Sequence, residues 1–174
     1  MIKEYDFIAI GGGSGGFNAA RVARGFSEKV AIVDGAQELG GLCILRGCMP
    51  SKTLIYSAEV LHLAQNARKF GLDVPSAKAD MPALHQRKLD VIKEFADYRV
   101  GAMTSDKYDL YRARAKFVDS HTIELDDGTR LRGKKFIVAT GSRIAKPKIP
   151  GIDEPDIWTS DDVLELDFLP ESVI

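Results

Sequence analysis

The sequence has few of the residues that bind metals or cross-link small secreted domains. Its 174 residues include only two cysteines, three histidines and one tryptophan. A structural zinc site needs about four ligands, and the histidines, at His62, His85 and His121, lie far from the cysteines in the sequence. We therefore expect no metal site, and we expect His62 and His85 to be ordinary surface or core residues.

The chain also lacks long apolar runs and an excess of charge of either sign. No apolar run in the sequence approaches the ~20 residues that a membrane-spanning helix needs. Its first residues are mixed and charged, which indicates no signal peptide, so we expect a cytoplasmic protein without a membrane partner. The formal net charge of −1 argues against a nucleic-acid partner.

Both cysteines lie in one short glycine-rich stretch, five positions apart, at Cys43 and Cys48. On one regular helix this spacing would separate them by roughly 8–9 Å, which exceeds the ~7 Å between Cα atoms that a disulfide tolerates. A bridge therefore needs irregular backbone, which Gly47 permits. Pro50 suits the first turn of a helix, whose positive end would stabilise a thiolate at Cys48. Lys52 would lie on the same face of that helix.

The cysteine pair has several interpretations. A structural disulfide is disfavoured in a chain without a secretory signal. Spacing alone supports two inert buried thiols and a redox-active pair about equally. The residues that flank the pair, and the motifs described next, favour the redox-active pair.

A glycine-rich turn near the N-terminus separates two apolar runs that are typical of buried parallel strands, at Phe7–Ile10 and Lys29–Val33. The residues between them, 17–25, have helical composition, and Asp34 follows the second run. This order of strand, glycine turn, helix, strand and acid is typical of a dinucleotide-binding unit, in which phosphate rests on the helix N-terminus and the acid binds a ribose. The glycines that fit the G-x-G-x-x-G pattern are Gly11, Gly13 and Gly16.

The rest of the chain predicts a mixed α/β protein. We expect helices over residues 51–70 and 80–99, the second capped by Asp80. Alternation over 111–117 predicts a half-buried strand, and residues 122–131 predict a hairpin with a glycine turn. A further buried strand is expected over 136–139.

The cysteine stretch, Gly-Gly-Leu-Cys-Ile-Leu-Arg-Gly-Cys-Met-Pro-Ser-Lys, closely resembles the redox motif of the class I flavoprotein disulfide reductases, G-G-T-C-x-N-x-G-C-x-P-S-K. The sequence departs from this motif at Leu42, Leu45 and Arg46. Two further stretches resemble the same family in the same order: the glycine turn, and Ala139-Thr140-Gly141-Ser142 followed by Ile149-Pro150-Gly151. Among the members of the family, the chain is most like dihydrolipoamide dehydrogenase.

The resemblance implies a Rossmann-like FAD-binding domain, with a parallel central sheet, helices and an added antiparallel β-hairpin or meander. Cys48 would face the flavin, Cys43 would exchange with substrate, and Lys52 would lie near the flavin ring. These three residues would be catalytic. The residues that the resemblance assigns to FAD are Gly11, Gly13, Ser14, Gly15, Gly16, Asp34, Gly41, Cys48, Lys52, Ala115, Ala139, Thr140 and Gly141.

The resemblance also implies a domain plan and a reaction. Residues 1–150 would form the N-terminal portion of the FAD-binding domain, and residues 151–174 a connector whose last residues open a strand of an NAD(P)-binding domain. The intact enzyme would be a homodimer that passes electrons between NADH or NADPH, FAD, the cysteine pair and a dithiol or disulfide substrate. No histidine of the chain matches the catalytic base of the family, so we expect these residues alone to be inactive. A mercuric reductase-like enzyme and a non-catalytic redox sensor that binds a dinucleotide remain the alternatives.

Overall fold

The computed structural model describes residues 2–174, which divide into two units. The first unit comprises the residues up to Cys43 together with Phe95–Ser142, and the second comprises Ile44–Glu94 and Arg143–Ile174. Each unit is considered by itself.

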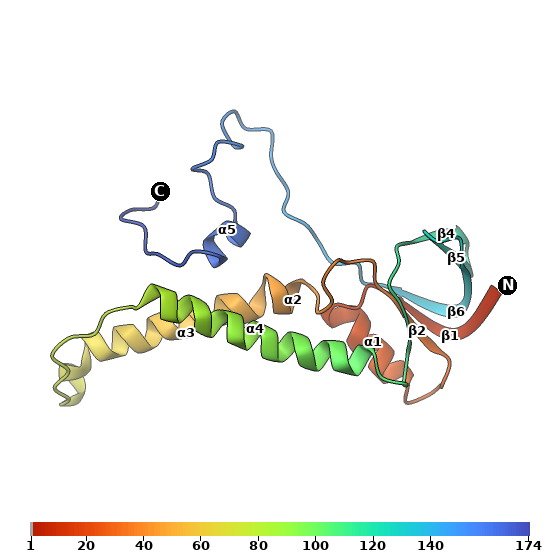
Figure 1. Ribbon diagram of the computed structural model, residues 1–174, viewed down its shortest axis with the longest axis horizontal. Coiled ribbons are helices and arrows are strands. Elements are labelled where there is room, and N and C mark those ends of the chain that lie inside the picture. The colour runs from red at the N-terminus through yellow and green to blue at the C-terminus, as the bar shows by residue number, and fades with distance from the viewer. Residues whose placement is uncertain (1) are drawn as a thin grey trace. The chain divides into compact units, whose positions relative to one another are not determined.

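The first unit is built on one six-stranded sheet in the order β3-β2-β1-β6-β5-β4 (Figure 1). Four neighbouring strands, β3, β2, β1 and β6, pair in parallel. The strands β6, β5 and β4 form an antiparallel meander. This arrangement confirms the predicted fold class. The strands are β1 (Ile2–Ile10), β2 (Val30–Val33), β3 (Asp109–Tyr111), β4 (Ala115–Asp119), β5 (Thr122–Leu125) and β6 (Arg130–Val138).

Side chains of the central strands alternate between two apolar clusters, one on each face of the sheet. On β1, Ile8 and Ile10 belong to one cluster and Ala9 to the other. On β2, all four residues are buried and divide between the clusters in the same way. Helix α1 (Ser14–Ala23) contributes Phe17 and Ala20 to the second cluster. A strand buried on both faces reads as a continuous apolar run, which is why the sequence identified β1 and β2.

Three strand predictions were wrong in their extent. The strand expected over Phe7–Ile10 begins at Ile2, because its first residues pair with β6. Residues 111–117 do not form one strand: β3 ends at Tyr111 beside β2, and β4 begins at Ala115 beside β5. The hairpin strand and the strand expected over 136–139 are instead one strand, β6, which pairs with β5 through Arg130–Arg132 and with β1 along its length. Alternation fixes which face a side chain occupies, but it does not specify the partner of the strand.

The second unit is mainly helical. Its elements are α3 (Cys48–Gln65), the 3₁₀ helix η1 (Ala67–Phe70), the part of α4 (Met81–Met103) that precedes residue 95, and α5 (Ser160–Leu164). Helix η1 ends at Gly71, whose φ of 75° is the left-handed value expected of a glycine stop. Asp80 caps α4 as predicted, because its Oδ1 accepts a hydrogen bond of 3.1 Å from the Ala83 N–H.

The C-terminal segment differs from expectation in two ways. Helix α5 was not predicted; its N-terminus is closed by a capping box between Thr159 and Asp162. Within the described residues, 171–174 form no strand, although the apolar run there predicted the start of one. A strand needs a hydrogen-bonding neighbour, and none of the described strands pairs with this segment.

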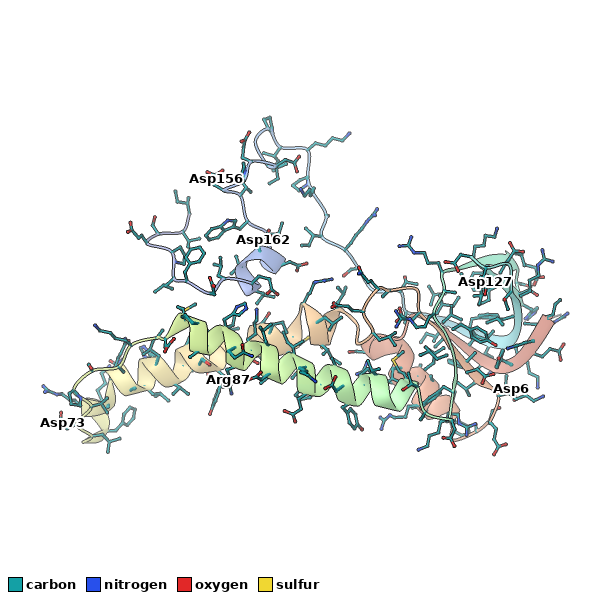
Figure 2. The ribbon with its side chains drawn as sticks, viewed as in Figure 1. Asp6, Asp73, Arg87, Asp127, Asp156 and Asp162 are labelled. Carbon is teal, nitrogen blue, oxygen red and sulfur yellow. The ribbon has the colours of Figure 1, made fainter. Side chains whose placement is uncertain are left out.

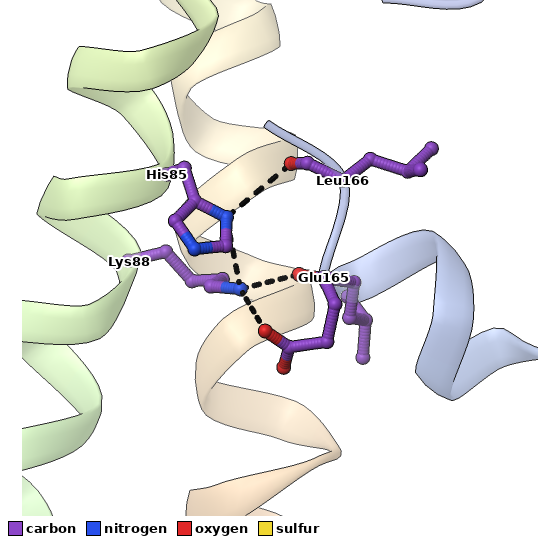
Figure 3. A network of polar contacts seen from close by, with 5 residues as sticks. His85, Lys88, Glu165 and Leu166 are labelled. Carbon is purple, nitrogen blue, oxygen red and sulfur yellow. Dashed lines mark hydrogen bonds and ion pairs between the residues drawn. The ribbon is translucent and has the colours of Figure 1, made fainter. Parts of the chain in front are cut away.

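A buried lysine ties this segment to α4. The Lys88 side chain is fully buried, and its Nζ donates hydrogen bonds of 2.5 Å to the Leu164 carbonyl oxygen and 3.2 Å to Glu165 Oε2 (Figure 3). His85 Nδ1 lies 3.3 Å from the Leu166 carbonyl oxygen. Beside these contacts, an apolar pocket of about 250 Å³ is lined in part by Trp158, the single tryptophan of the sequence. In residues 2–174, no helix has the length and apolar character to cross a bilayer.

Candidate functional site

The glycine turn joins the end of β1 to the start of α1 with almost no space between backbones. Gly11 has a φ of 101°, and a Cβ atom there would lie 2.2 Å from the Ala139 carbonyl oxygen. A Cβ at Gly16 would lie 1.7 Å from the Gly11 carbonyl oxygen. The chain ends of β1 and β6 and the first turn of α1 therefore meet at positions that only glycine fits.

The N-terminus of α1 is not closed by a capping side chain. Gly13 is the N-cap residue, no side chain caps the helix, and its first turn contains no acidic residue. The first backbone N–H groups of a helix lack partners within the helix and attract anions. Ser14 and Gly15 lie at this end, so the turn can accept a phosphate group as the sequence predicts.

Asp34 follows β2 and reaches back to the same turn. It is 8% exposed, its Oδ2 accepts a hydrogen bond of 2.7 Å from the Gly12 N–H, and its Oδ1 accepts one of 2.8 Å from the Ala36 N–H. These bonds fix the carboxylate beside the glycine turn. A carboxylate oxygen can accept more than one hydrogen bond, so the bonds are compatible with the predicted contact to a ribose hydroxyl.

Gly41 brings the segment that leads to the first cysteine against the glycine turn. Its φ is 80°, and a Cβ there would lie 2.5 Å from the Gly13 Cα atom. Cys43 follows within the short helix α2 (Leu42–Leu45) and is partly buried. Gly41 thus contacts the predicted phosphate site, and Cys43, the predicted exchange thiol, lies two residues after it in the sequence.

Cys48 and Lys52 belong to the second unit. Cys48 is exposed and is the first residue of α3, an 18-residue helix whose N-cap, Gly47, makes no side-chain capping bond. The backbone at Gly47 is irregular, with φ and ψ of −136° and −112°, so the two cysteines do not share one regular helix. The first turn of α3 contains no acidic residue, and its dipole therefore favours an anion at the position of Cys48.

The end of β6 supplies the other predicted cofactor residues in the first unit. The Ala139 Cβ atom would lie 3.4 Å from a Cβ at Gly16, and a Cβ at Gly141, whose φ is 75°, would lie 3.4 Å from Leu42 Cδ1. Thr140 lies between them, with its Cα 3.1 Å from a Cβ at Gly11. Ala115 begins β4 and is not part of this cluster of close contacts.

Sequence reasoning missed two side chains that line the same region. Met103 ends α4, and a Cβ at Gly12 would lie 2.2 Å from its Cε atom. Arg99 lies one turn earlier on α4, with its guanidinium carbon 4.6 Å from the centre of the Phe17 ring. The sequence predicted a packing helix that ended near Arg99, and no local pattern indicated that its last turns would reach α1.

Comparison with known proteins places these features in a family. A family model described as pyridine nucleotide-disulphide oxidoreductase matches residues 5–174. The chain is 36% identical to a mercuric reductase of Bacillus cereus over 168 residues, and 34% identical to the dihydrolipoyl dehydrogenase of Bacillus subtilis (strain 168) over 189. These alignments cover 96% and 100% of this chain but only 26% and 39% of the relatives, so the chain spans well under half of their length.

The fold of this chain is also similar to that of a solved structure. The HOCl-induced flavoprotein disulfide reductase RclA from Escherichia coli superposes with a TM-score of 0.72 at 27% identity. The match covers 95% of this chain and 35% of that protein.

Proposed function

Because the chain belongs to the pyridine nucleotide-disulphide oxidoreductase family, we propose that it forms the FAD-binding, disulfide-bearing part of an NAD(P)H-linked dithiol–disulfide oxidoreductase. The observation that carries the proposal is the backbone contact between Gly13 and Gly41. It joins an uncapped helix N-terminus, suited to a dinucleotide phosphate, to the segment that holds Cys43. The reaction would resemble that of dihydrolipoamide dehydrogenase.

The residues of the first unit fit FAD. Its pyrophosphate would rest on the first turn of α1, and Asp34 would bind the ribose. The glycines at positions 11, 16 and 41 let protein backbone segments meet closely around the turn, and at Gly13, where the nearest atom to a Cβ is 3.6 Å away, the absence of a side chain would let the pyrophosphate approach the backbone. Ala115, Ala139, Thr140 and Gly141 would complete the site. When bound, FAD supplies the two-electron chemistry that links nicotinamide to the thiols.

The thiol chemistry follows from the two cysteines. A substrate thiolate would attack Cys43 Sγ of a Cys43–Cys48 disulfide; a new S–S bond forms, the protein S–S bond breaks, and its electron pair leaves on Cys48. A second substrate thiolate would then attack the substrate sulfur and expel Cys43 as a thiolate. The substrate dithiol is oxidised to a disulfide, the protein disulfide is reduced, and two protons pass to solvent. The dipole of α3 and Lys52 would stabilise the Cys48 thiolate.

Two alternatives come from the comparisons and from the chemistry. Identity of 36% to a mercuric reductase supports a mercuric reductase-like enzyme equally well at the level of this chain. A redox sensor would use the same dinucleotide site and cysteine pair without turnover. Reduction of lipoamide, reduction of Hg(II), or neither, by NADH or NADPH would distinguish the three. The nicotinamide site and a homodimer interface would lie in the part of the relatives that this chain does not span. A cytoplasmic location is part of the same proposal.

The test of the cofactor assignment is flavin content. Protein expressed from its complete gene should purify yellow and release FAD when denatured. Gly13→Ala should weaken flavin binding but keep the fold, because Gly13 has an ordinary φ of −66° and the nearest atom to a Cβ there is 3.6 Å away. The matched control is Gly101→Ala, where a Cβ meets nothing within 4 Å; it should stay yellow. A colourless wild-type protein that takes up no added FAD would refute the proposal.

A further inference from the structure

Two kinds of contact hold the C-terminal segment, residues 158–170, on the helices of the second unit. The first kind is apolar: Trp158 and Phe168 line the small pocket together with Leu54 of α3 and Leu84 of α4. The two aromatic rings also pack edge to face, with 6.2 Å between their centres. Apolar contacts are not directional, so they hold the segment against the helices without specifying its register.

The second kind is the set of hydrogen bonds made by the buried Lys88, and these are directional (Figure 3). An ammonium group has three N–H donors. Three acceptors surround Lys88 Nζ: the Leu164 carbonyl oxygen at 2.5 Å, Glu165 Oε2 at 3.2 Å and His85 Nδ1 at 3.4 Å. The first two belong to the C-terminal segment, so they fix the segment to one position on α4.

Burial of the ammonium makes this position specific. The Lys88 side chain has no exposed surface, whereas the Glu165 side chain is 61% exposed. A charge removed from water needs its partners in the folded state, and loss of a partner leaves it uncompensated. A different register of the segment would take the acceptors away from Nζ, and no water could reach the group to replace them.

The same contact completes helix α5. Its N-terminus is closed by the capping box between Thr159 and Asp162. Leu164 is the last residue of the helix, and carbonyl groups at a helix C-terminus have no partner within the helix. The Lys88 ammonium donates to this carbonyl and places a positive charge at the negative end of the helix dipole. Both ends of this short helix are therefore satisfied while it is docked on α4.

The segment also lies on the route to the rest of the protein. The chain matches the N-terminal part of its relatives, which continue beyond it. We propose that Lys88 is a positioning residue: it fixes the point from which the chain continues toward the part that would carry the nicotinamide, and so sets the rate of flavin reduction. This inference rests on the proposed function, in which the nicotinamide site would lie outside these residues.

Lys88 acts in this proposal through geometry alone. In flavin reduction a hydride passes from the reduced nicotinamide, which is oxidised, to the flavin, which is reduced. Such a transfer depends steeply on distance, and a 1 Å misplacement can cost about 10²-fold in rate. A segment that docks in several registers would present the nicotinamide in several positions. Binding of the nicotinamide and exchange at the cysteine pair would not change, because neither involves residues 158–170.

Hydrogen exchange tests the contact itself and needs neither flavin nor nicotinamide. In protein expressed from its complete gene, Lys88→Met should speed exchange about tenfold in peptides that cover residues 159–166. Backbone N–H groups at 163, 165 and 166 donate to carbonyl groups within this stretch. The matched control is Arg87→Met, which removes the exposed arginine directly before Lys88 on α4 (Figure 2). It should leave exchange at the wild-type rate.

Stopped-flow absorbance of FAD-loaded protein tests the consequence, because the two half-reactions can be measured separately. Lys88→Met should lower the limiting rate of flavin reduction by NADH or NADPH about tenfold, with an unchanged Kd for the nicotinamide. Flavin reduction by an excess of dithiol, which would pass through the cysteine pair, should keep the wild-type rate. A general loss of stability would instead lower the flavin content or slow both half-reactions together. Arg87→Met should match the wild-type protein in both.

The outcomes separate this inference from the proposed function. Wild-type exchange in Lys88→Met, an unchanged limiting rate, equal slowing of both half-reactions, or the same effect in Arg87→Met overturns the positioning role. If Lys88→Met does not fold, Lys88→Gln, which keeps a donor without the charge, is held to the same criteria. A wild-type protein that takes up no FAD would refute the proposed function and the positioning role with it, while faster exchange in Lys88→Met would leave the contact between Lys88 and the segment standing.

Discussion

Neighbouring glycines in the first turn of α1 should respond in opposite ways to the same added methyl group. Gly16 is buried, and its Cβ would lie 1.7 Å from the Gly11 carbonyl oxygen. Gly15 is exposed, and its Cβ would lie 3.5 Å from the nearest atom, the Cβ of Ala139. The clash at Gly16 involves backbone on both sides, so neither partner can rotate away, and β1 and α1 must separate.

The magnitudes follow from these contacts. Gly16→Ala should cost about 3 kcal/mol of unfolding free energy, the upper end of the usual overpacking range. With a urea dependence of about 2 kcal/mol per molar, the unfolding midpoint should fall by about 1.5 M. Gly15→Ala makes an ordinary van der Waals contact and gains helix propensity of about 0.5–1 kcal/mol, so its midpoint should rise slightly.

Urea titrations of the wild-type protein and both variants, followed by far-ultraviolet circular dichroism, make this comparison directly. Two results would contradict the prediction: Gly16→Ala unfolding at the wild-type midpoint, or Gly15→Ala losing as much stability as Gly16→Ala. Either result would mean that the close approach of β1 to α1 is not what requires glycine at position 16.

Three further outcomes are expected. Tyr5→Phe removes a hydroxyl that lies 2.5 Å from Asp109 Oδ2 and 2.6 Å from the Tyr111 hydroxyl oxygen; it should cost about 1 kcal/mol in the same titration, because these hydrogen bonds are lost. Lys88→Met removes the donor to the Leu164 carbonyl oxygen and to the Glu165 carboxylate. The fluorescence emission maximum of Trp158 should then shift to the red, because the segment that forms its pocket is released. Stability should fall as the pH drops below about 4, and an acid titration monitored by circular dichroism checks this. Hydrogen bonds lower the pKa of several carboxyls in the folded protein below their ordinary values of 3.8 or 4.5. The stability that these carboxylates contribute is therefore complete above the ordinary pKa values and is lost as the pH falls through the pKa values of the folded state. A stability that stays constant down to pH 3 would contradict this. These carboxyls are Asp6, Asp119, Glu124, Asp127 and Asp162.

The parts of the fold that the sequence predicted are those coded by neighbouring residues. A glycine turn between two apolar runs gave β1, α1 and β2, because the required backbone conformations and the burial pattern are both local. The start of α3 near Gly47 followed from a glycine and a proline placed three residues apart. The glycine turn of the hairpin was predicted in the same way, and Gly128 has the φ of 83° that such a turn uses.

The features that the sequence did not predict depend on contacts across the chain. Strand β6 is continuous because β1 pairs with it from Ile2 to Ile10. The residues of β6 themselves do not indicate which strand is the partner. Lys88 is fully buried although lysine is usually exposed, since its acceptors are supplied by residues 76 and 77 positions later. The predicted helix ended near Arg99, whereas α4 continues to Met103. The sequence did not indicate the stacking of Arg99 on Phe17, because Phe17 lies 82 residues earlier.

In the proposed function, Cys48 would be a thiolate that faces a bound flavin, and Cys43 would exchange with substrate. Two-electron reduction of FAD-loaded protein, expressed from its complete gene, tests this claim when absorbance is recorded at long wavelength. We predict a long-wavelength thiolate–flavin band in the wild-type protein that Cys48→Ser abolishes and Cys43→Ser retains. A band that persists in Cys48→Ser and disappears in Cys43→Ser would reverse the two roles, and the absence of any band in the FAD-loaded wild-type protein would contradict the account.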